Sequence, residues 1–189
     1  MKTPRLKEGR VYRTEKFRDL DSNPTRLVNR LVRQGRLTPL SKGLYYAPRE
    51  SSFGPVPPRE DEVLRAFFRG KPYLRTGPSI WNALGLGATM VEVWPLVYNT
   101  TRSGRVELAG KPFELRRVRF PRQPTPEFFV VDLIENRSRA GLDLAVARHA
   151  LVQALRAGRF YREGLEDMAG RFGTQATRHF VQSALAEAV

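Results

Sequence analysis

The segment 23–35 constrains the fold of this chain more than any other part of the sequence. Asn23 followed by Pro24 is the pairing of an N-cap residue with proline at the first helical position. Gly35 stands where a left-handed C-cap ends a helix. Between these ends the apolar residues recur at spacings of one, three and four, which buries one side of a helix: Leu27, Val28, Leu31 and Val32. The segment therefore predicts a two-sided helix that ends near Gln34.

The other side of this predicted helix carries side chains that read DNA bases and phosphates. They are Thr25, Arg26, Asn29, Arg30 and Arg33. Arginine pairs with guanine O6 and N7, asparagine pairs with adenine N6 and N7, and threonine contacts phosphate or a thymine methyl group. A solvated surface helix would have the same composition, so the neighbouring segments decide between the two interpretations.

A second, shorter helix is expected just before it. Thr14 is placed as an N-cap, and Phe17 and Leu20 form an apolar stripe. The turn that follows, Asp21-Ser22-Asn23, joins the two helices. Two short helices joined by a tight turn describe a helix-turn-helix. Ser22 and Asn23, at the start of the second helix, are included among the predicted DNA contacts.

A β-hairpin is predicted directly after the helix pair. Residues 37–40 and 44–46 form its strands, and Gly43 supplies the backbone freedom that a tight turn needs. Lys42 at the tip is placed to reach a phosphate. Val11-Tyr12 is a candidate third strand. The order of helix, helix and basic hairpin predicts a winged helix-turn-helix over residues 1–50.

The charge of the chain agrees with a polyanionic partner. The net charge is +14, from 33 lysines and arginines against 19 acidic residues. Residues 1–50 alone hold 13 basic and 5 acidic residues. A generally arginine-rich proteome would also raise the charge, but the concentration at one end favours binding of nucleic acid. We therefore expect double-stranded DNA as a partner.

The rest of the chain predicts a second, mixed domain. Residues 51–59 are rich in proline and are expected to be an extended linker. Residues 60–189 are expected to form an α+β domain that ends in helices. Its predicted helices and strands are 60–69, 79–84, 92–100, 105–108, 111–116, 142–156 and 174–188. The predicted fold class is thus α+β, with an N-terminal winged helix-turn-helix and a mixed C-terminal domain.

No motif of enzyme chemistry stands out. The chain has no cysteine, and neither His149 nor His179 has a second ligand at metal spacing. Residues 84–89 lack a phosphate-loop pattern and are predicted to end a helix. The carboxylate pairs Asp132 with Glu135 and Glu163 with Glu166 are interpreted as solvated pairs on helices. We expect neither an enzyme nor a cofactor, although an enzyme that acts on nucleic acid stays open as a third hypothesis.

The sequence favours a location in the cytoplasm. No apolar run approaches the ~18 residues of a membrane span, so no membrane partner is expected. The first five residues contain no apolar stretch of a secretory signal.

Two stretches resemble a known family. The first is Asn-Arg-Leu-Val-Arg-Gln-Gly-Arg-Leu at 29–37, continuing to Lys-Gly-Leu-Tyr-Tyr-Ala-Pro at 42–48. The second is Gly-Pro-Ser-Ile-Trp-Asn-Ala-Leu-Gly-Leu at 77–86, with related segments at 97–100 and 113–117. Together they resemble the AbiEi-type antitoxins of type IV toxin–antitoxin systems, over most of the chain.

The resemblance implies two activities. The N-terminal domain would repress its own operon at inverted repeats, and the C-terminal domain would counter a cognate nucleotidyltransferase-type toxin. The alternative is a stand-alone winged-helix transcription factor whose C-terminal domain senses a ligand or dimerises. The sequence leaves the oligomeric state and the operator open.

Overall fold

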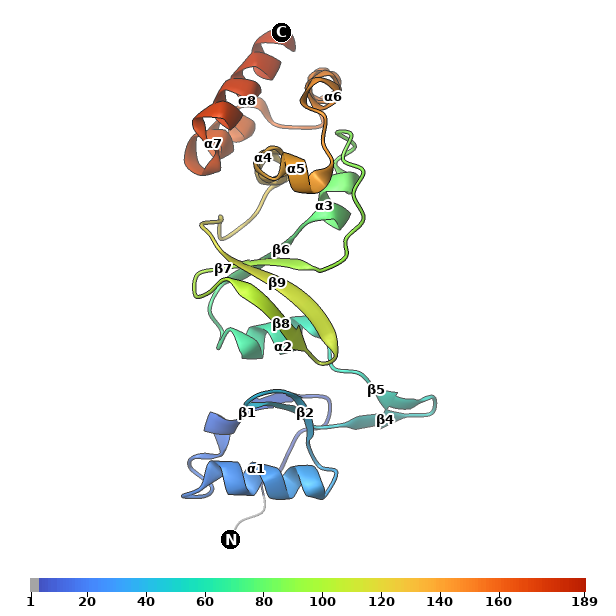
Figure 1. Cartoon of the computed structure of the whole chain (residues 1–189), viewed down its shortest axis with the longest axis vertical. Helices are drawn as coiled ribbons and strands as arrows, with labels where there is room; N and C mark the ends of the chain where they lie inside the picture. The colour runs from blue at the N-terminus through green and yellow to red at the C-terminus, as the bar shows by residue number, and fades with distance from the viewer. Residues whose placement is uncertain (1–3) are drawn as a thin grey trace. The chain divides into compact units, whose positions relative to one another are not determined.

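The computed structural model describes residues 4–189 as a mixed α+β protein (Figure 1). The first three residues, which belong to the stretch that lacks a signal pattern, lie outside the described residues. In chain order the elements are β1 (Val11–Arg13), η1 (Thr14–Phe17), α1 (Pro24–Arg33), β2 (Thr38–Ser41), β3 (Leu44–Tyr46), β4 (Arg49–Ser51), β5 (Gly54–Val56), α2 (Glu60–Phe67), β6 (Tyr73–Thr76), α3 (Pro78–Ala83), β7 (Leu96–Asn99), β8 (Gly104–Leu108), β9 (Lys111–Arg117), α4 (Pro126–Glu135), α5 (Arg137–Ala140), α6 (Leu144–Arg156), α7 (Arg162–Phe172) and α8 (Gln175–Glu187).

The chain forms two compact units that do not follow the predicted boundary. The first runs to Tyr73 and also contains Arg105–Phe113, and the second contains Leu74–Gly104 and Glu114–Val189. The segment 51–59, expected to be an extended linker, instead contributes to the β4–β5 hairpin. This hairpin and α2 belong to the first unit because they bond to its strands. Tyr46 donates its hydroxyl proton to the carbonyl of Val56 at 2.8 Å, and the Arg13 guanidinium donates to the carbonyl of Ala66 at 3.1 Å.

The first unit contains a three-stranded antiparallel sheet in the order β1–β3–β2. The predicted hairpin and third strand are therefore present, with Gly43 in the left-handed region at φ 74°. A small core lies between the helices and this sheet: Phe17, Leu27, Val28, Leu31, Leu37 and Ala47.

The prediction of an α-helix that starts at Thr14 is wrong, because the segment forms a 3-10 helix. Residues 14–17 form a single turn of 3-10 helix, and its N-cap is Arg13, with no side-chain hydrogen bond. The N–H of Arg18 donates to the carbonyl of Glu15, three positions earlier, which is the 3-10 spacing that short segments often adopt. Phe17 is buried as expected, but Leu20 is exposed and forms no apolar stripe with it.

Helix α1 follows the sequence prediction closely. The Asn23 side chain caps it by accepting from the backbone N–H of Arg26 at 3.0 Å, and Pro24 is its first residue. Gln34 is the C-cap, and Gly35 has a φ of 69°.

A four-stranded sheet has the order β6–β7–β9–β8, with β7 and β9 parallel. The strand predicted at 92–100 begins only at Leu96. Pro95 explains the late start because proline has no N–H to donate to a sheet. Strand β6 is an element that the sequence analysis missed.

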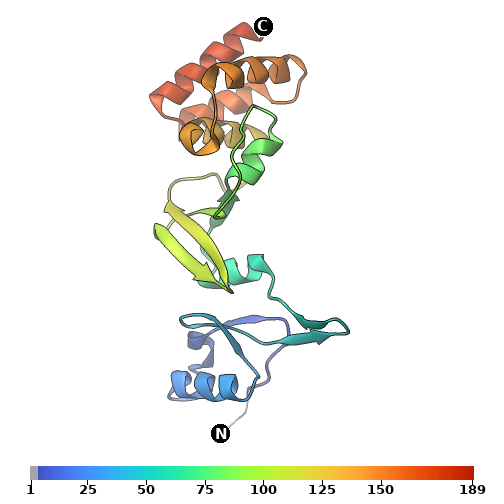
Figure 2. The same ribbon diagram turned by 45° about the vertical axis from the view of Figure 1, so that its right-hand side comes forward.

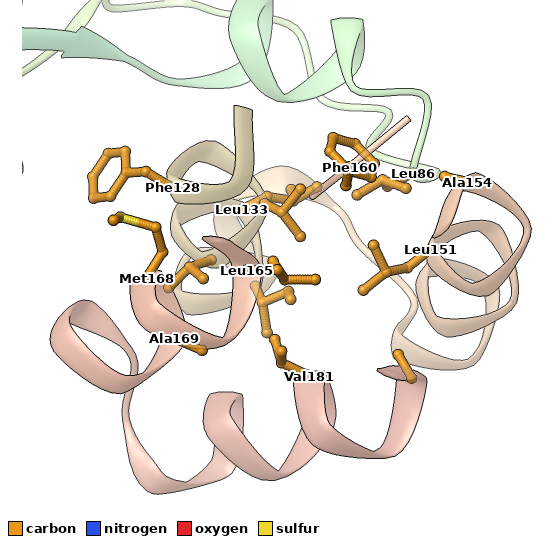
Figure 3. Close-up of a cluster of buried hydrophobic side chains, with 14 of the residues drawn as sticks. Leu86, Phe128, Leu133, Leu151, Ala154, Phe160, Leu165, Met168, Ala169 and Val181 are labelled. Carbon is orange, nitrogen blue, oxygen red and sulfur yellow. The ribbon is translucent and has the colours of Figure 1, made fainter. Parts of the chain in front are cut away.

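The second unit ends in a group of helices that surrounds α4, seen from another side in Figure 2. Helix α4 is apolar on nearly all sides, which is typical of a fully buried helix, and seven of its ten residues are buried. Figure 3 shows Leu133 of α4, Leu151 of α6, Leu165 of α7 and Val181 of α8 around a shared core. Helices α6 and α8 confirm the predicted C-terminal helices, and α7 contains Glu163 and Glu166, which were expected on a helix without predicted ends. Within residues 4–189, no helix has both the length and the apolar character needed to cross a membrane.

Candidate nucleic-acid interface

Helix α1 separates its two sets of side chains cleanly. Leu27, Val28 and Leu31 are buried in the core of the first unit. At 100° per residue, positions 25, 26, 29, 30 and 33 span an arc of about 140° on the opposite side. The structure thus brings five of the predicted site residues onto one helix face.

The side chains on this arc differ in exposure. Thr25, Arg26, Asn29 and Arg33 are exposed, and Arg30 is half-buried. The Nε of Arg33 donates to the carbonyl of Asn29 at 3.4 Å, one turn earlier. Most of the arc therefore presents donors and acceptors to solvent, where a ligand would meet them.

Asn23, one of the predicted DNA-contacting residues, is also part of the N-terminal cap of α1. The Asn23 side-chain oxygen caps the helix, and the Asn23 backbone N–H donates to the carboxylate of Asp21 at 2.9 Å. Within residues 4–189, the side-chain N–H₂ group of Asn23 has no hydrogen-bond partner. Ser22 is exposed beside it. Helix N-termini favour phosphate because their backbone N–H groups and dipole point outward.

Lys42 lies on a separate element from these side chains. It is exposed in the β2–β3 turn. The turn is held by a bond from the N–H of Thr14 to the carbonyl of Gly43 at 3.2 Å. Lys42 is therefore a second positively charged position on the first unit, and it does not belong to the polar face of α1.

Among its charged side chains, the sequence that contains α1 carries only positive ones over a long segment. Residues 22–49 contain six lysines and arginines and no aspartate or glutamate. One of the six, Arg36, donates to the carbonyl of Pro4 at 2.8 Å rather than to a carboxylate. No acidic side chain of this stretch offsets the field at the exposed face of α1.

The second unit contains a buried polar network that the sequence analysis missed. Asp132, interpreted as part of a solvated pair, is only 5% exposed. Its carboxylate accepts hydrogen bonds from the Thr76 hydroxyl, from Trp81 Nε1 at 2.8 Å and from the Tyr98 hydroxyl at 2.7 Å. The Asn136 amide adds a fourth bond at 3.1 Å. The solvated interpretation of Asp132 is wrong because α4 is covered on the side that carries this residue.

This network is held by burial and by reciprocal bonds. Burial raises the pKa of Asp132, and the donors from Thr76 and Tyr98 act against that rise. Burial and the neighbouring carboxylate also raise the pKa of Tyr98. The Asn136 side-chain oxygen accepts from Arg116 at 3.0 Å, so the chain of bonds reaches β9. The network joins β6, α3, β7, β9 and α4 and serves their packing.

The other ionisable residues singled out in the sequence differ from Asp132. Glu135 accepts two bonds from Thr174, at 2.7 and 2.9 Å, whereas Glu163 and Glu166 are exposed. Both His149 and His179 are exposed. Among residues 4–189, no three His, Asp or Glu side chains are grouped so as to hold a metal ion.

The chain was compared with protein families, curated proteins and solved structures. No protein-family model and no curated protein matches this chain. The chain is similar to the crystal structure of RV2827C protein from Mycobacterium tuberculosis, with 15% sequence identity and a TM-score of 0.49. The match covers 95% of this chain and 72% of that one. The functional assignment therefore depends on the residues of this chain itself.

Proposed function

We propose that this chain is a sequence-reading DNA-binding regulator. In this proposal, η1, α1 and the sheet β1–β3–β2 form a winged helix-turn-helix, and α1 is the recognition helix. The observation that carries the proposal is the exposed face of α1, which is polar, cationic and opposite a fully buried face. An α-helix of this kind fits the major groove of B-form DNA.

Each side chain of the face has a chemical role in the proposal. Arg26 and Arg30 pair with guanine edges, and Asn29 pairs with adenine. Thr25 contacts phosphate or a thymine methyl group, and Arg33 contacts phosphate or a guanine edge. Base contacts would supply the sequence preference, and phosphate contacts would fix the orientation of the helix.

The remaining predicted residues would bind the DNA backbone. Ser22 and Asn23 would meet a phosphate at the N-terminus of α1, and Lys42 would meet a second phosphate from the hairpin turn. The uninterrupted positive charge of residues 22–49 supports this arrangement.

The wider role that we propose is that of an antitoxin. It would repress its own operon at inverted repeats and counter a nucleotidyltransferase-type toxin through the second unit. Support for this part comes from the resemblance of residues 29–48 and 77–86 to AbiEi-type antitoxins. Its test is co-expression with the product of the neighbouring gene. Rescue of growth supports the antitoxin role, and unchanged toxicity contradicts it while leaving the DNA-binding proposal intact.

DNA binding is tested by measuring affinity for the DNA upstream of the gene and for a scrambled duplex at near-physiological salt. A specific binder prefers its site by about 10³-fold or more. Arg26→Ala and Arg30→Ala are each expected to weaken specific binding by about 1–3 kcal/mol if they contact bases.

The matched control is Arg65→Ala, which removes an exposed arginine of α2 in the same unit. This variant is expected to keep the specific affinity of the wild type. Equal affinity of Arg26→Ala, Arg30→Ala and wild type for the upstream DNA would show that α1 is not the recognition helix.

A further inference from the structure

The second unit carries its own dense group of arginines, which the proposed function does not use. The segment 116–122 reads Arg-Arg-Val-Arg-Phe-Pro-Arg and contains no acidic residue. It forms the end of β9 and the start of the loop that leads to α4. Four cations thus gather over seven positions of one strand end and loop.

Two adjoining cavities lie against this segment. The larger has a volume of 690 Å³ and the smaller of 240 Å³. Both are lined by Val118, Arg119 and Phe172, so they adjoin at these residues and together make up a depression beside the loop, α4 and the end of α7. We call this depression the arginine groove, and its rim residues are Arg117, Arg119, Phe120, Arg122, Arg171 and Phe172.

Three of the rim arginines are not neutralised by the protein. Within residues 4–189, the guanidinium groups of Arg117, Arg119 and Arg122 have no hydrogen-bond or ion-pair partner, and all three are exposed. By contrast, Arg171 pairs with Asp167 at 3.0 Å. Unpaired guanidinium groups at one depression form a site for phosphate, to which arginine binds with two parallel hydrogen bonds.

A larger cavity in the first unit differs from the arginine groove in the pairing of its arginines. It has a volume of 860 Å³ and is also lined by several arginines. There Arg10 pairs with Glu62 at 2.7 Å, and Arg13 and Arg69 both pair with Glu15. Three of its four arginines are therefore paired with carboxylates of the protein, unlike Arg117, Arg119 and Arg122 of the arginine groove.

The walls of the arginine groove are aromatic. Phe120 and Phe172 are half-buried, so each keeps part of its ring accessible. Phe172 is fixed by an edge-on contact with Phe128 at 5.4 Å between ring centres, and the guanidinium of Arg171 lies 5.2 Å from its ring centre. Fixed rings beside cations are the combination on which nucleic-acid bases stack while their phosphates bind arginine.

The floor of the groove is already closed by the protein's own bonds. Tyr98, Asp132 and Asn136 line the smaller cavity, and their polar groups bond to one another. Glu135, the other carboxylate of that cavity, bonds to Thr174. Since the floor offers few unpaired donors or acceptors, the groove would select a ligand by stacking and phosphate charge rather than by base identity.

We propose that the arginine groove binds a nucleotide, with its phosphates on Arg117, Arg119 and Arg122 and its base against Phe120 and Phe172. The nucleotide is either free or part of a single-stranded nucleic acid, because both present the same phosphate and base chemistry. The proposal is independent of DNA reading by α1, since none of these residues belongs to the first unit.

The test uses the full chain and a fluorescently labelled single-stranded RNA of about 10 nucleotides, a length that one binding groove covers. Anisotropy gives its affinity, and unlabelled ATP or a duplex of the same length is added as a competitor. The double variant Arg119→Gln/Arg122→Gln is expected to bind the strand about tenfold more weakly and to flatten the salt dependence by roughly 0.7 per lost phosphate contact. Phe120→Leu keeps an apolar side chain but removes a stacking surface, and it is expected to weaken binding about fivefold.

A matched control separates the arginine groove from general charge. Arg137→Gln removes an exposed arginine of the second unit that lines neither cavity. It should bind the single strand within about twofold of the wild type, because Arg137 does not touch the groove.

The outcomes are distinct. Competition by ATP, lost in the double variant, assigns the site to free nucleotides. Binding of the strand without competition by ATP assigns it to single-stranded nucleic acid. Unchanged affinity of the double variant overturns the proposal, and so does a duplex that competes as well as the strand, since stacking would then have no role.

Discussion

Replacing Asp132 with asparagine tests whether the buried network holds the second unit together. The substitution keeps the volume of the side chain, so it leaves no cavity, but it removes the charge and replaces one acceptor oxygen with an N–H₂ group. Two donors depend on that carboxylate in particular. Trp81 Nε1 has a single proton and donates it to Oδ2, and the Tyr98 hydroxyl donates to Oδ1.

The expected loss of unfolding free energy follows from the number of hydrogen bonds that Asp132→Asn breaks and that cannot form again. The Asn136 amide still has the backbone carbonyl of Asp132 as an acceptor at 2.7 Å, and the Thr76 hydroxyl can rotate. One of Trp81 and Tyr98 would face the new N–H₂ group, and the other would keep a weaker, uncharged acceptor. An orphaned buried donor costs about 1–3 kcal/mol, and the loss of a charge-assisted bond adds about 1 kcal/mol. We expect Asp132→Asn to destabilise the second unit by about 2–4 kcal/mol.

The assay exploits the positions of the tryptophans. The chain has two, Trp81 and Trp94, and both lie in the second unit, so tryptophan fluorescence during urea unfolding reports on that unit. With a urea m-value of about 1–3 kcal/mol/M, the midpoint should fall by roughly 0.7–4 M.

The control for this substitution is Glu166→Gln, which alters an exposed carboxylate of α7. It should change the free energy of unfolding by less than about 0.5 kcal/mol. A loss below about 1 kcal/mol for Asp132→Asn would refute the reasoning, because the network would then contribute no more than an exposed pair.

Two further predictions concern other parts of the fold. Arg139 donates two hydrogen bonds to Glu114, at 2.8 and 2.6 Å, and this contact lowers the pKa of Glu114; its stabilisation is therefore present above the unfolded pKa and lost as pH falls through the folded pKa. The free energy of unfolding of wild type should exceed that of Glu114→Gln at pH 7, and the difference should shrink as the pH is lowered through the folded pKa of Glu114. A difference that stays constant with pH would contradict this. Asn23→Ala removes the cap of α1 and should destabilise the helix by about 1 kcal/mol, seen as faster hydrogen exchange of the α1 amides, while Asn23→Asp should keep the protection of wild type.

The fold of the first unit could be predicted where local interactions decide it. The cap at Asn23, the proline at position 24 and the glycine at position 35 act within one turn of α1, so the sequence places the ends of that helix to within one residue. The same holds for the turn at Gly43. The prediction of an α-helix at Thr14 was wrong because four residues are too few to show the periodicity that distinguishes a 3-10 helix from an α-helix.

The boundary between the units could not be predicted because long-range contacts set it. The prolines of residues 51–59 are typical of a linker, yet β5 pairs with β4, and Arg13 bonds to carbonyl groups at the end of α2. Arg13 and Ala66 lie more than fifty positions apart in the sequence. No local sequence pattern predicts a hydrogen bond between residues so far apart.

The candidate sites divide in the same way. The polar face of α1 is visible in the sequence because helical periodicity alone sorts its residues into a buried and an exposed side. Asp132 has the spacing of a solvated carboxylate, and only the packing of β6, α3 and β7 around α4 shows that it is buried. The run of arginines at 116–122 is visible in the sequence, but only the tertiary structure shows that Arg117, Arg119 and Arg122 stay unpaired within residues 4–189 and that Phe172 of α7 lies beside them.

What the sequence by itself determined is therefore the local part: the ends and the two sides of α1, the hairpin that follows, the C-terminal helices and the excess of positive charge. The tertiary structure decided which residues share a unit, which carboxylate is buried and which arginines stay unpaired at a cavity. The physical reason is the range of the interactions. Capping, turn formation and periodicity act over three or four positions, whereas burial and ion pairing depend on segments that meet only when the chain has folded.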